Sequence, residues 1–258
     1  MSADSSMSGL GAAWPALAFD RLGRFVFRYR NYLVPVVLVG VVALTPRAAA
    51  GGDRLDAWLD VLGFLVAMLG QALRVTVIGY AYIRRGGVNK QLAAPKLVCE
   101  GFYAHSRNPM YVGNFLLFVG LMLIYNSPWG YALILPAVAL ALLALVRAEE
   151  RYLTERFGSE YTDYCRRVNR FLPNPRGLRA TMRSMHFDWR RSLRKDYGTA
   201  FAWLSGAFVL MAWGRVVRFG WIGAAPEVRC LAVSYVPVVL AYGVVRWLKK
   251  SRRLQSPD

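Results

Sequence analysis

Six long apolar stretches divide the chain, and they constrain its fold more than any other feature. An α-helix needs about 20 apolar residues to cross a bilayer, and most of the stretches approach that length. Hydrophobic residues make up 56% of the sequence, which exceeds the usual share in soluble domains. The sequence therefore predicts an all-α protein, a polytopic transmembrane bundle of about six spans. The expected spans are residues 25–44, 57–82, 111–126, 129–146, 199–213 and 228–247.

The positive charge falls on one side of these spans. The chain has 33 Lys and Arg against 15 Asp and Glu, a formal net charge of +18. Of the 33 cations, 27 lie in segments 1–30, 84–107, 147–198 and 246–258, which share one side if there are six spans. Cytoplasmic loops are enriched in Lys and Arg, so we expect both termini in the cytoplasm. The basicity then reflects topology and attraction to anionic lipid, and we expect no nucleic-acid partner.

The remaining composition excludes several classes of protein. Three cysteines are too few for a disulfide scaffold, and two histidines far apart in sequence offer no metal-ligand spacing. We therefore expect no metal site. The sequence also lacks a glycine-rich phosphate loop and a recognisable nucleophile–base pair.

A short turn at residues 125–129 joins the third and fourth spans. Its sequence, Tyr-Asn-Ser-Pro-Trp, is typical of a tight turn between antiparallel helices. Such a hairpin places residues 107–111, before the third span, beside residues 147–150, after the fourth. Residues 149–171 then read as a cytoplasmic helical region broken at Gly158, and residues 179–197 as a basic helix in the headgroup layer.

Three side chains stand out as unfavourable without a partner or ligand. Glu149 and Glu150 close an apolar span, where carboxylates oppose the helix macrodipole. Arg74 lies inside the second span, about ten residues from its basic end, which is far for snorkelling. With Gln71 one turn earlier, Arg74 is expected to line a polar cavity.

Two sequence blocks carry a resemblance to a known family. Gly101-Phe-Tyr-Ala-His-Ser-Arg-Asn-Pro-Met-Tyr-Val-Gly113 resembles G-x-Y-x-x-x-R-H-P-x-Y-x-G, and Glu149-Glu-Arg-Tyr-Leu-Thr-Glu-Arg-Phe-Gly158 is similar to E-E-x-x-L-x-x-x-F-G. Gly70-Gln-Ala-Leu-Arg74 also looks like the family's G-x-x-L-R. These motifs are typical of the isoprenylcysteine carboxyl methyltransferases and phospholipid methyltransferases, which are integral membrane enzymes. The resemblance covers roughly residues 57–175.

The resemblance implies transfer of a methyl group from S-adenosyl-L-methionine to a hydrophobic or lipid-like acceptor at the cytoplasmic membrane face. Arg74 and Arg147 are the candidate catalytic residues. The residues implied for cofactor binding are Lys96, Leu97, Val98, Tyr103, Asn108, Pro109, Met110, Tyr111, Glu149 and Glu150.

Two positions depart from the family pattern. Asn108 replaces the usual histidine, and Leu145 stands where the member that methylates a carboxylate has an arginine; the nearest arginine is Arg147. These departures argue against a prenylcysteine carboxylate as the acceptor and leave an amine headgroup, a lipid or isoprenoid hydroxyl and a hydrophobic thiol open.

The resemblance also suggests a division of the chain. The chain then comprises an N-terminal segment with the first span (1–56), a methyltransferase core (57–175), a basic interfacial helix (176–198) and two additional spans (199–258).

Two other functions remain as alternatives. Membrane sterol-type reductases, which use NADPH, look similar around Arg107–Tyr111, but the paired carboxylates Glu149 and Glu150 are poor neighbours for a 2′-phosphate. A small transporter or scaffold would use Arg74 and Gln71 as a translocation site. That reading leaves both motif blocks unexplained.

Overall fold

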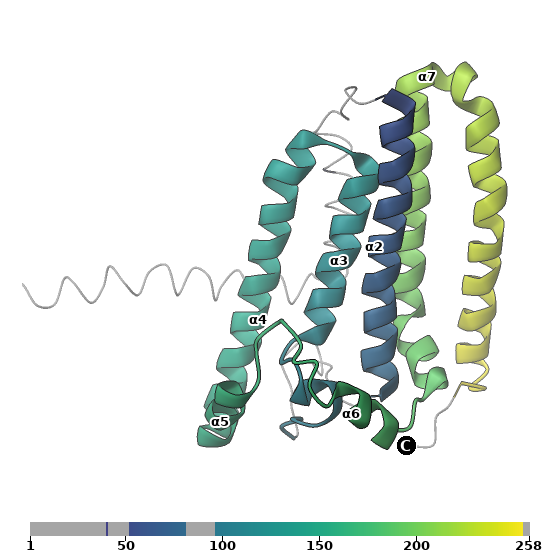
Figure 1. Ribbon diagram of the computed structural model, residues 1–258. Coiled ribbons are helices and arrows are strands. Elements are labelled where there is room, and N and C mark those ends of the chain that lie inside the picture. The colour runs from purple at the N-terminus through teal and green to yellow at the C-terminus, as the bar shows by residue number, and fades with distance from the viewer. Residues whose placement is uncertain (1–39, 41–51, 81–95, 255–258) are drawn as a thin grey trace, which may run out of the picture.

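The computed structural model describes residue 40, residues 52–80 and residues 96–254, and Figure 1 shows their arrangement. Except for Gly40, the expected first span lies outside these residues. The described part consists of helices joined by loops and contains no strand, which confirms the all-α prediction. Its elements are α2 (Gly52–Tyr80), η2 (Gly101–Ala104), α3 (Pro109–Tyr125), η3 (Gly130–Ile134), α4 (Leu135–Phe157), α5 (Ser159–Arg167), α6 (Leu178–Ser184) and α7 (Trp189–Lys250).

Three of the described helices are long and apolar enough to cross a membrane. They are Arg54–Tyr80, Gly130–Phe157 and Trp189–Lys250, while α3 is apolar but shorter. α7 has 62 residues and leaves helical geometry at Gly220, whose φ is 67°. Figure 1 shows its two arms running antiparallel, side by side. The rings of Phe201 and Tyr242 stack with centroids 4.1 Å apart and join the arms.

α7 begins earlier than the expected fifth span. Its first residue is Trp189, ten residues before position 199, and the Asp188 carboxylate caps it by accepting a hydrogen bond from the Arg191 amide. The basic stretch 179–197 is therefore divided between α6 and the first turns of α7.

Glycines bring the backbones of α2 and α3 into close contact. A Cβ built on Gly70 would lie 2.7 Å from the Gly113 carbonyl oxygen, and one on Gly63 would lie 2.6 Å from that of Gly120. Membrane helices associate largely through such close van der Waals packing at small residues. Gly70 and Gly113 belong to two of the motifs noted above, so at least part of their role is structural.

The turn between α3 and α4 has the expected form. α3 ends at Tyr125, and Asn126 follows in the left-handed region with a φ of 49°. After the turn, α4 runs back beside α3 toward the end of the bundle that carries α5 and α6, at the bottom of Figure 1; this is called the α6 end below. Gly158, with a φ of 54°, separates α4 from α5 as predicted.

At the opposite end, where α7 turns, ion pairs hold α7 against α2. Arg218 contacts Asp56 at 2.9 Å, and Arg215 contacts Asp60 at 3.1 Å. Both carboxylates are buried. Asp56 also accepts a hydrogen bond from the Asn126 side chain at 2.9 Å, which ties the α3–α4 turn to the same cluster.

We expect opposite effects from two glycine-to-alanine substitutions. Gly70→Ala should lower stability by about 1–3 kcal/mol, because the added methyl group meets the α3 backbone. Gly243→Ala on α7 has nothing within 4 Å and should be neutral or stabilise by up to about 1 kcal/mol through helix propensity. Thermal unfolding of the two purified variants in detergent measures both effects. Equal melting temperatures would show that the close contact does not limit stability.

Candidate active site at the α6 end of the bundle

The two motif blocks meet at the α6 end. The Tyr111 hydroxyl, in the first turn of α3, donates a hydrogen bond to the Glu149 carboxylate of α4 at 2.7 Å. Arg107, just before α3, forms an ion pair with Glu150 at 3.0 Å. The antiparallel hairpin produces both contacts, and they confirm the neighbourhood predicted from the short turn.

Glu150 is the centre of a small charge network. It contacts Arg107 on one side and Arg170 on the other, the latter at 2.7 Å. Burial alone would lower the pKa of Arg107, but the Glu150 carboxylate, together with Cys165 and Tyr161, raises that pKa above its usual value. Burial also raises the pKa of the neighbouring Tyr161 phenol, and Glu150 adds to the rise. Arg107 therefore remains a cation and Tyr161 a neutral phenol at physiological pH.

The segment before α3 is fixed by the chain that follows α5. Residues 105–108 form hydrogen bonds with residues 169–174, and the acceptors are backbone carbonyl oxygens. The Arg107 amide donates to the Asn169 carbonyl at 2.9 Å, and the Ser106 hydroxyl donates to the Phe171 carbonyl at 2.9 Å. The Asn108 side chain donates to the Arg170 carbonyl at 3.3 Å. Asn108 is buried, so its side-chain amide forms its hydrogen bond with the segment 169–174 rather than with solvent.

The residues implied for cofactor binding differ in their exposure. Leu97 and Tyr103 are buried: Leu97 packs with Tyr161 and Tyr164, and the Tyr103 carbonyl accepts a hydrogen bond from the Tyr164 hydroxyl at 2.7 Å. Pro109 is buried as the first residue of α3. Three further residues, Val98, Met110 and Tyr111, are partly exposed, as are Glu149 and Glu150. Lys96 is exposed.

The candidate catalytic residues lie in different surroundings. Arg147 is exposed on α4, whereas Leu145, at the position expected for an arginine, is buried. Arg74 is buried between α2, α3 and α7. The structure thus does not bring Arg147 and Arg74 into one cluster.

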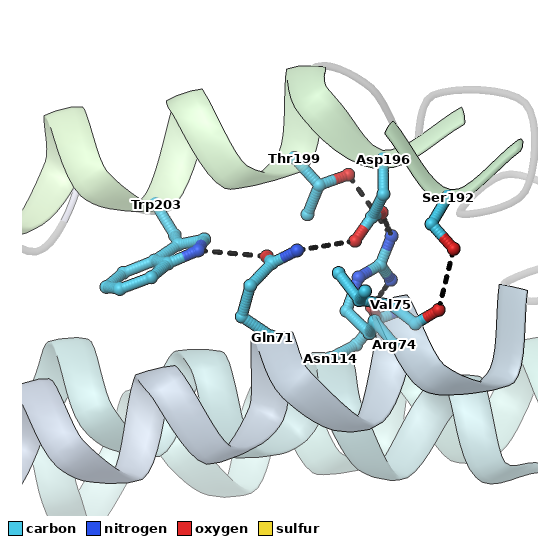
Figure 2. Close-up of polar contacts among 8 residues, drawn as sticks. All are labelled: Gln71, Arg74, Val75, Asn114, Ser192, Asp196, Thr199 and Trp203. Carbon is cyan, nitrogen blue, oxygen red and sulfur yellow. Dashed lines mark hydrogen bonds and ion pairs between the residues drawn. The ribbon is translucent and has the colours of Figure 1, made fainter. Parts of the chain in front are cut away.

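Arg74 belongs to a polar network that the sequence did not reveal in full (Figure 2). Its guanidinium forms an ion pair with Asp196 of α7, donates to the Asn114 side chain of α3, and donates to the Thr199 hydroxyl at 3.2 Å. Gln71 donates to the other Asp196 oxygen at 2.6 Å. The Trp203 indole N–H donates to Gln71 at 2.9 Å, which extends the network along α7.

Asp196 is the member of this network that sequence reasoning missed. It is 1% exposed and supplies the counter-ion of the buried arginine, which also donates a hydrogen bond to Asn114. Its signal in the sequence was an acid three residues before an apolar span, in a stretch that is otherwise basic except for Asp188. The family motif includes Arg74 but does not reach the helix that supplies its counter-ion.

Comparisons with known proteins agree with the two motif blocks. The phospholipid methyltransferase family model matches residues 58–160. A cobalt-zinc-cadmium resistance protein of Cupriavidus metallidurans is 32% identical over 168 residues, which cover 64% of this chain and 74% of the relative. The protein-S-isoprenylcysteine O-methyltransferase of Tribolium castaneum is 34% identical over 45% of this chain and 42% of its own length.

The human protein-S-isoprenylcysteine O-methyltransferase is 32% identical over 48% of this chain and 45% of its own length. This chain belongs to the isoprenylcysteine carboxyl methyltransferase and phospholipid methyltransferase family. It is therefore an integral membrane methyltransferase. No solved structure gives a significant match to it.

The region matched by the family model does not include every helix of the bundle. The family model ends at residue 160, before α6 and α7. Asp196, Thr199 and Trp203 lie beyond it, so the Arg74 network joins the family region to a helix outside the match.

Removing the Asp196 carboxylate should destabilise the protein strongly. Asp196→Ala leaves the buried Arg74 charge uncompensated, which costs about 3–5 kcal/mol in comparable buried pairs. Asp163→Ala is the matched control, because the Arg166–Asp163 pair is 77% and 61% exposed and exposed pairs contribute about 0–1 kcal/mol. Thermal unfolding in detergent checks the difference. A loss no larger than that of the control would exclude a stabilising role for the buried pair.

Proposed function

We propose that this methyltransferase is a multi-pass membrane protein that transfers a methyl group from S-adenosyl-L-methionine to a hydrophobic or lipid-like acceptor at the cytoplasmic face. The observation that carries the proposal is the hydrogen bond between Tyr111 and Glu149. It joins the two motif blocks, about 40 residues apart in sequence, into one site at the α6 end of the bundle.

The residues at this end fit the donor by their chemistry. S-adenosyl-L-methionine combines a cationic sulfonium and ammonium with an apolar adenine. Glu149 supplies a partly exposed carboxylate, and carboxylates accept strong hydrogen bonds from charged or hydroxyl donors. Tyr111 supplies a ring face, and Val98 and Met110 supply partly exposed apolar surface. Aromatic faces attract cations, so the same ring suits the sulfonium.

We assign these residues to binding and orientation rather than to covalent chemistry. When bound, S-adenosyl-L-methionine supplies an electrophilic methyl group. Methyl transfer then requires an acceptor held in line at near-contact distance, with water excluded. Tyr103, Leu97 and Pro109 form the buried base of the site, while Lys96 and Asn108 belong to the same segment. Glu150 fixes Arg107 and Arg170 and thereby supports the loop that carries these residues.

The acceptor is assigned by the location of the site. The site lies at one end of apolar helices, where a membrane-soluble acceptor and a water-soluble donor can meet. A six-span topology with both termini cytoplasmic, argued from the distribution of Lys and Arg, places that end in the cytoplasm. Arg74 is buried and Arg147 is exposed, so we assign Arg147 as the arginine that contacts the acceptor.

The alternatives have less support. A sterol-type reductase would need to accommodate the NADPH phosphate beside Glu149 and Glu150, whose charges repel it. The metal-resistance name of one relative raises metal binding, but no group of three or more potential ligands occurs among the described residues. Burial raises the pKa of the Cys99 thiol, which disfavours the thiolate that metals prefer. A transporter would leave the contact between the motif blocks without a role.

Replacing the Glu149 carboxylate should weaken donor binding. Glu149→Gln is expected to reduce the affinity for S-adenosylhomocysteine at least tenfold, equivalent to about 1.5 kcal/mol for a hydrogen bond to a charged group. Calorimetric titration of the detergent-purified protein measures the affinity for S-adenosylhomocysteine, and NADPH is titrated in parallel. Glu155→Gln, an exposed carboxylate on the same helix, should bind like the unmodified protein. Saturable binding of NADPH alone would instead assign the protein to the reductases.

Replacing Arg147 should separate acceptor use from donor binding. If Arg147 contacts the acceptor, Arg147→Ala should lower kcat/KM for the acceptor by about tenfold or more and leave the affinity for S-adenosylhomocysteine unchanged. Methylation assays with prenylcysteine, phospholipid amine and isoprenoid hydroxyl acceptors provide the measurement. Unaltered kinetics with an accepted substrate would remove Arg147 from the site.

A further inference from the structure

α6 is a short helix with one strongly basic face. Arg179 and Arg183 are one turn apart on this helix, and both are exposed. The sequence between residues 174 and 195 contains one acidic residue, Asp188, and it pairs with Arg191 at 3.2 Å. Further exposed cations flank the helix at positions 176, 190 and 195. The outer face of α6 therefore carries positive charge that this stretch does not neutralise.

The inner face of α6 packs on the candidate cofactor segment. Leu178 and Met182 contact the buried cluster that contains Phe102 and Tyr103. The Thr181 hydroxyl lies 2.9 Å from Nε2 of His105. The helix therefore connects its basic outer surface to η2, the turn that precedes the motif residues of α3.

The composition of α6 makes it dependent on outside contacts. Seven residues are too few for a stable isolated helix in water. Like charges four residues apart also destabilise a helix, and Arg179 and Arg183 have that spacing. An anion bound between the two guanidinium groups would turn this repulsion into attraction, because arginine binds phosphate through several N–H donors.

The surroundings point to a lipid phosphate rather than a soluble anion. α6 lies at the end of the bundle, close to the start of α7 (Figure 1). Trp189, the first residue of α7, is 55% exposed, and the Arg190 guanidinium lies 5.4 Å from its ring centroid. Exposed tryptophan beside arginine is typical of the headgroup layer, where the ring meets lipid and the cation meets phosphate.

We propose that the outer face of α6 binds the headgroups of anionic phospholipids, and that this contact stabilises the packing of α6 on η2 and so strengthens donor binding. Arg179 and Arg183 form the centre of the lipid surface. The coupling to donor binding rests on the proposed function, whereas the coupling between lipid charge and α6 order does not.

The test compares the protein in two kinds of nanodisc. One contains phosphatidylcholine alone, and in the other about one lipid in three is phosphatidylglycerol. Hydrogen exchange of the amides in residues 178–185 reports the order of α6. We expect exchange at least about fivefold slower with phosphatidylglycerol, since one basic residue near an anionic surface contributes roughly that factor. Arg179→Gln/Arg183→Gln should lose this difference. Arg252→Gln/Arg253→Gln, which removes two exposed cations elsewhere, should keep it.

Two further arms identify the source of the effect. Glycerol phosphate added to phosphatidylcholine nanodiscs should leave exchange unchanged; slowing by this soluble anion would overturn the lipid assignment. Hydrogen exchange in α2 and α3 should be equal in all variants. This control shows that the variants are folded. Equal exchange of α6 in both lipid mixtures would overturn the proposal.

Donor binding is measured separately with S-adenosylhomocysteine. Affinity should rise with phosphatidylglycerol in the unmodified protein and not in Arg179→Gln/Arg183→Gln. Lipid-dependent order of α6 with lipid-independent affinity would overturn the coupling. Absence of S-adenosylhomocysteine binding in every lipid, with α6 still responding to charge, would refute the proposed function and leave the lipid surface intact.

Discussion

The close contact between α2 and α3 is the constraint on which the other arrangements depend. Gly63 and Gly70 on α2 face Gly120 and Gly113 on α3 with no room for a side chain between the backbones. This contact sets the two helices in one register along most of their length. Because α3 begins within the first motif block, at Pro109, the contact also sets the height at which Tyr111 emerges. The α3–α4 hairpin then carries Glu149 back to the same height.

Charged and polar side chains connect the helices at three positions along the bundle. Apolar packing alone would allow these helices several relative orientations. At the turn of α7, Asp56 and Asp60 bind arginines of that helix. Within the bundle, Arg74 and Asp196 join α2 to α7, and at the α6 end Glu150 joins two arginines of the loops. Buried or half-buried charges tolerate few alternative geometries, so such pairs favour one arrangement of the helices.

Much of the fold and part of the site could be predicted from local sequence. The length of the apolar stretches predicted the helices, Asn126 and Pro128 indicated the hairpin, and Gly158 indicated the break between α4 and α5. These features could be predicted because each signal acts on the residues next to it. The meeting of Tyr111 and Glu149 followed from the hairpin geometry. The family resemblance supplied the candidate cofactor residues and the reaction class, which local physics did not.

Contacts between distant helices could not be predicted in the same way. Arg74 was recognised as needing polar surroundings, but nothing in its own helix indicates that the partner lies 122 residues later. The early start of α7 was also missed, because residues 189–198 are too basic to read as part of a span. Both features result from packing of the whole bundle, which sequence periodicity does not specify.

The Arg74–Asp196 pair has a consequence for how this protein can change over time. The arginine belongs to the family region, and its counter-ion belongs to a helix beyond the family match. Either charge alone would be buried without its partner, so a change at one position calls for a compensating change at the other. A recombinant that exchanges the C-terminal helices with those of a relative must carry a compatible residue at both positions. A helix outside the family match is thereby a structural part of the enzyme's core.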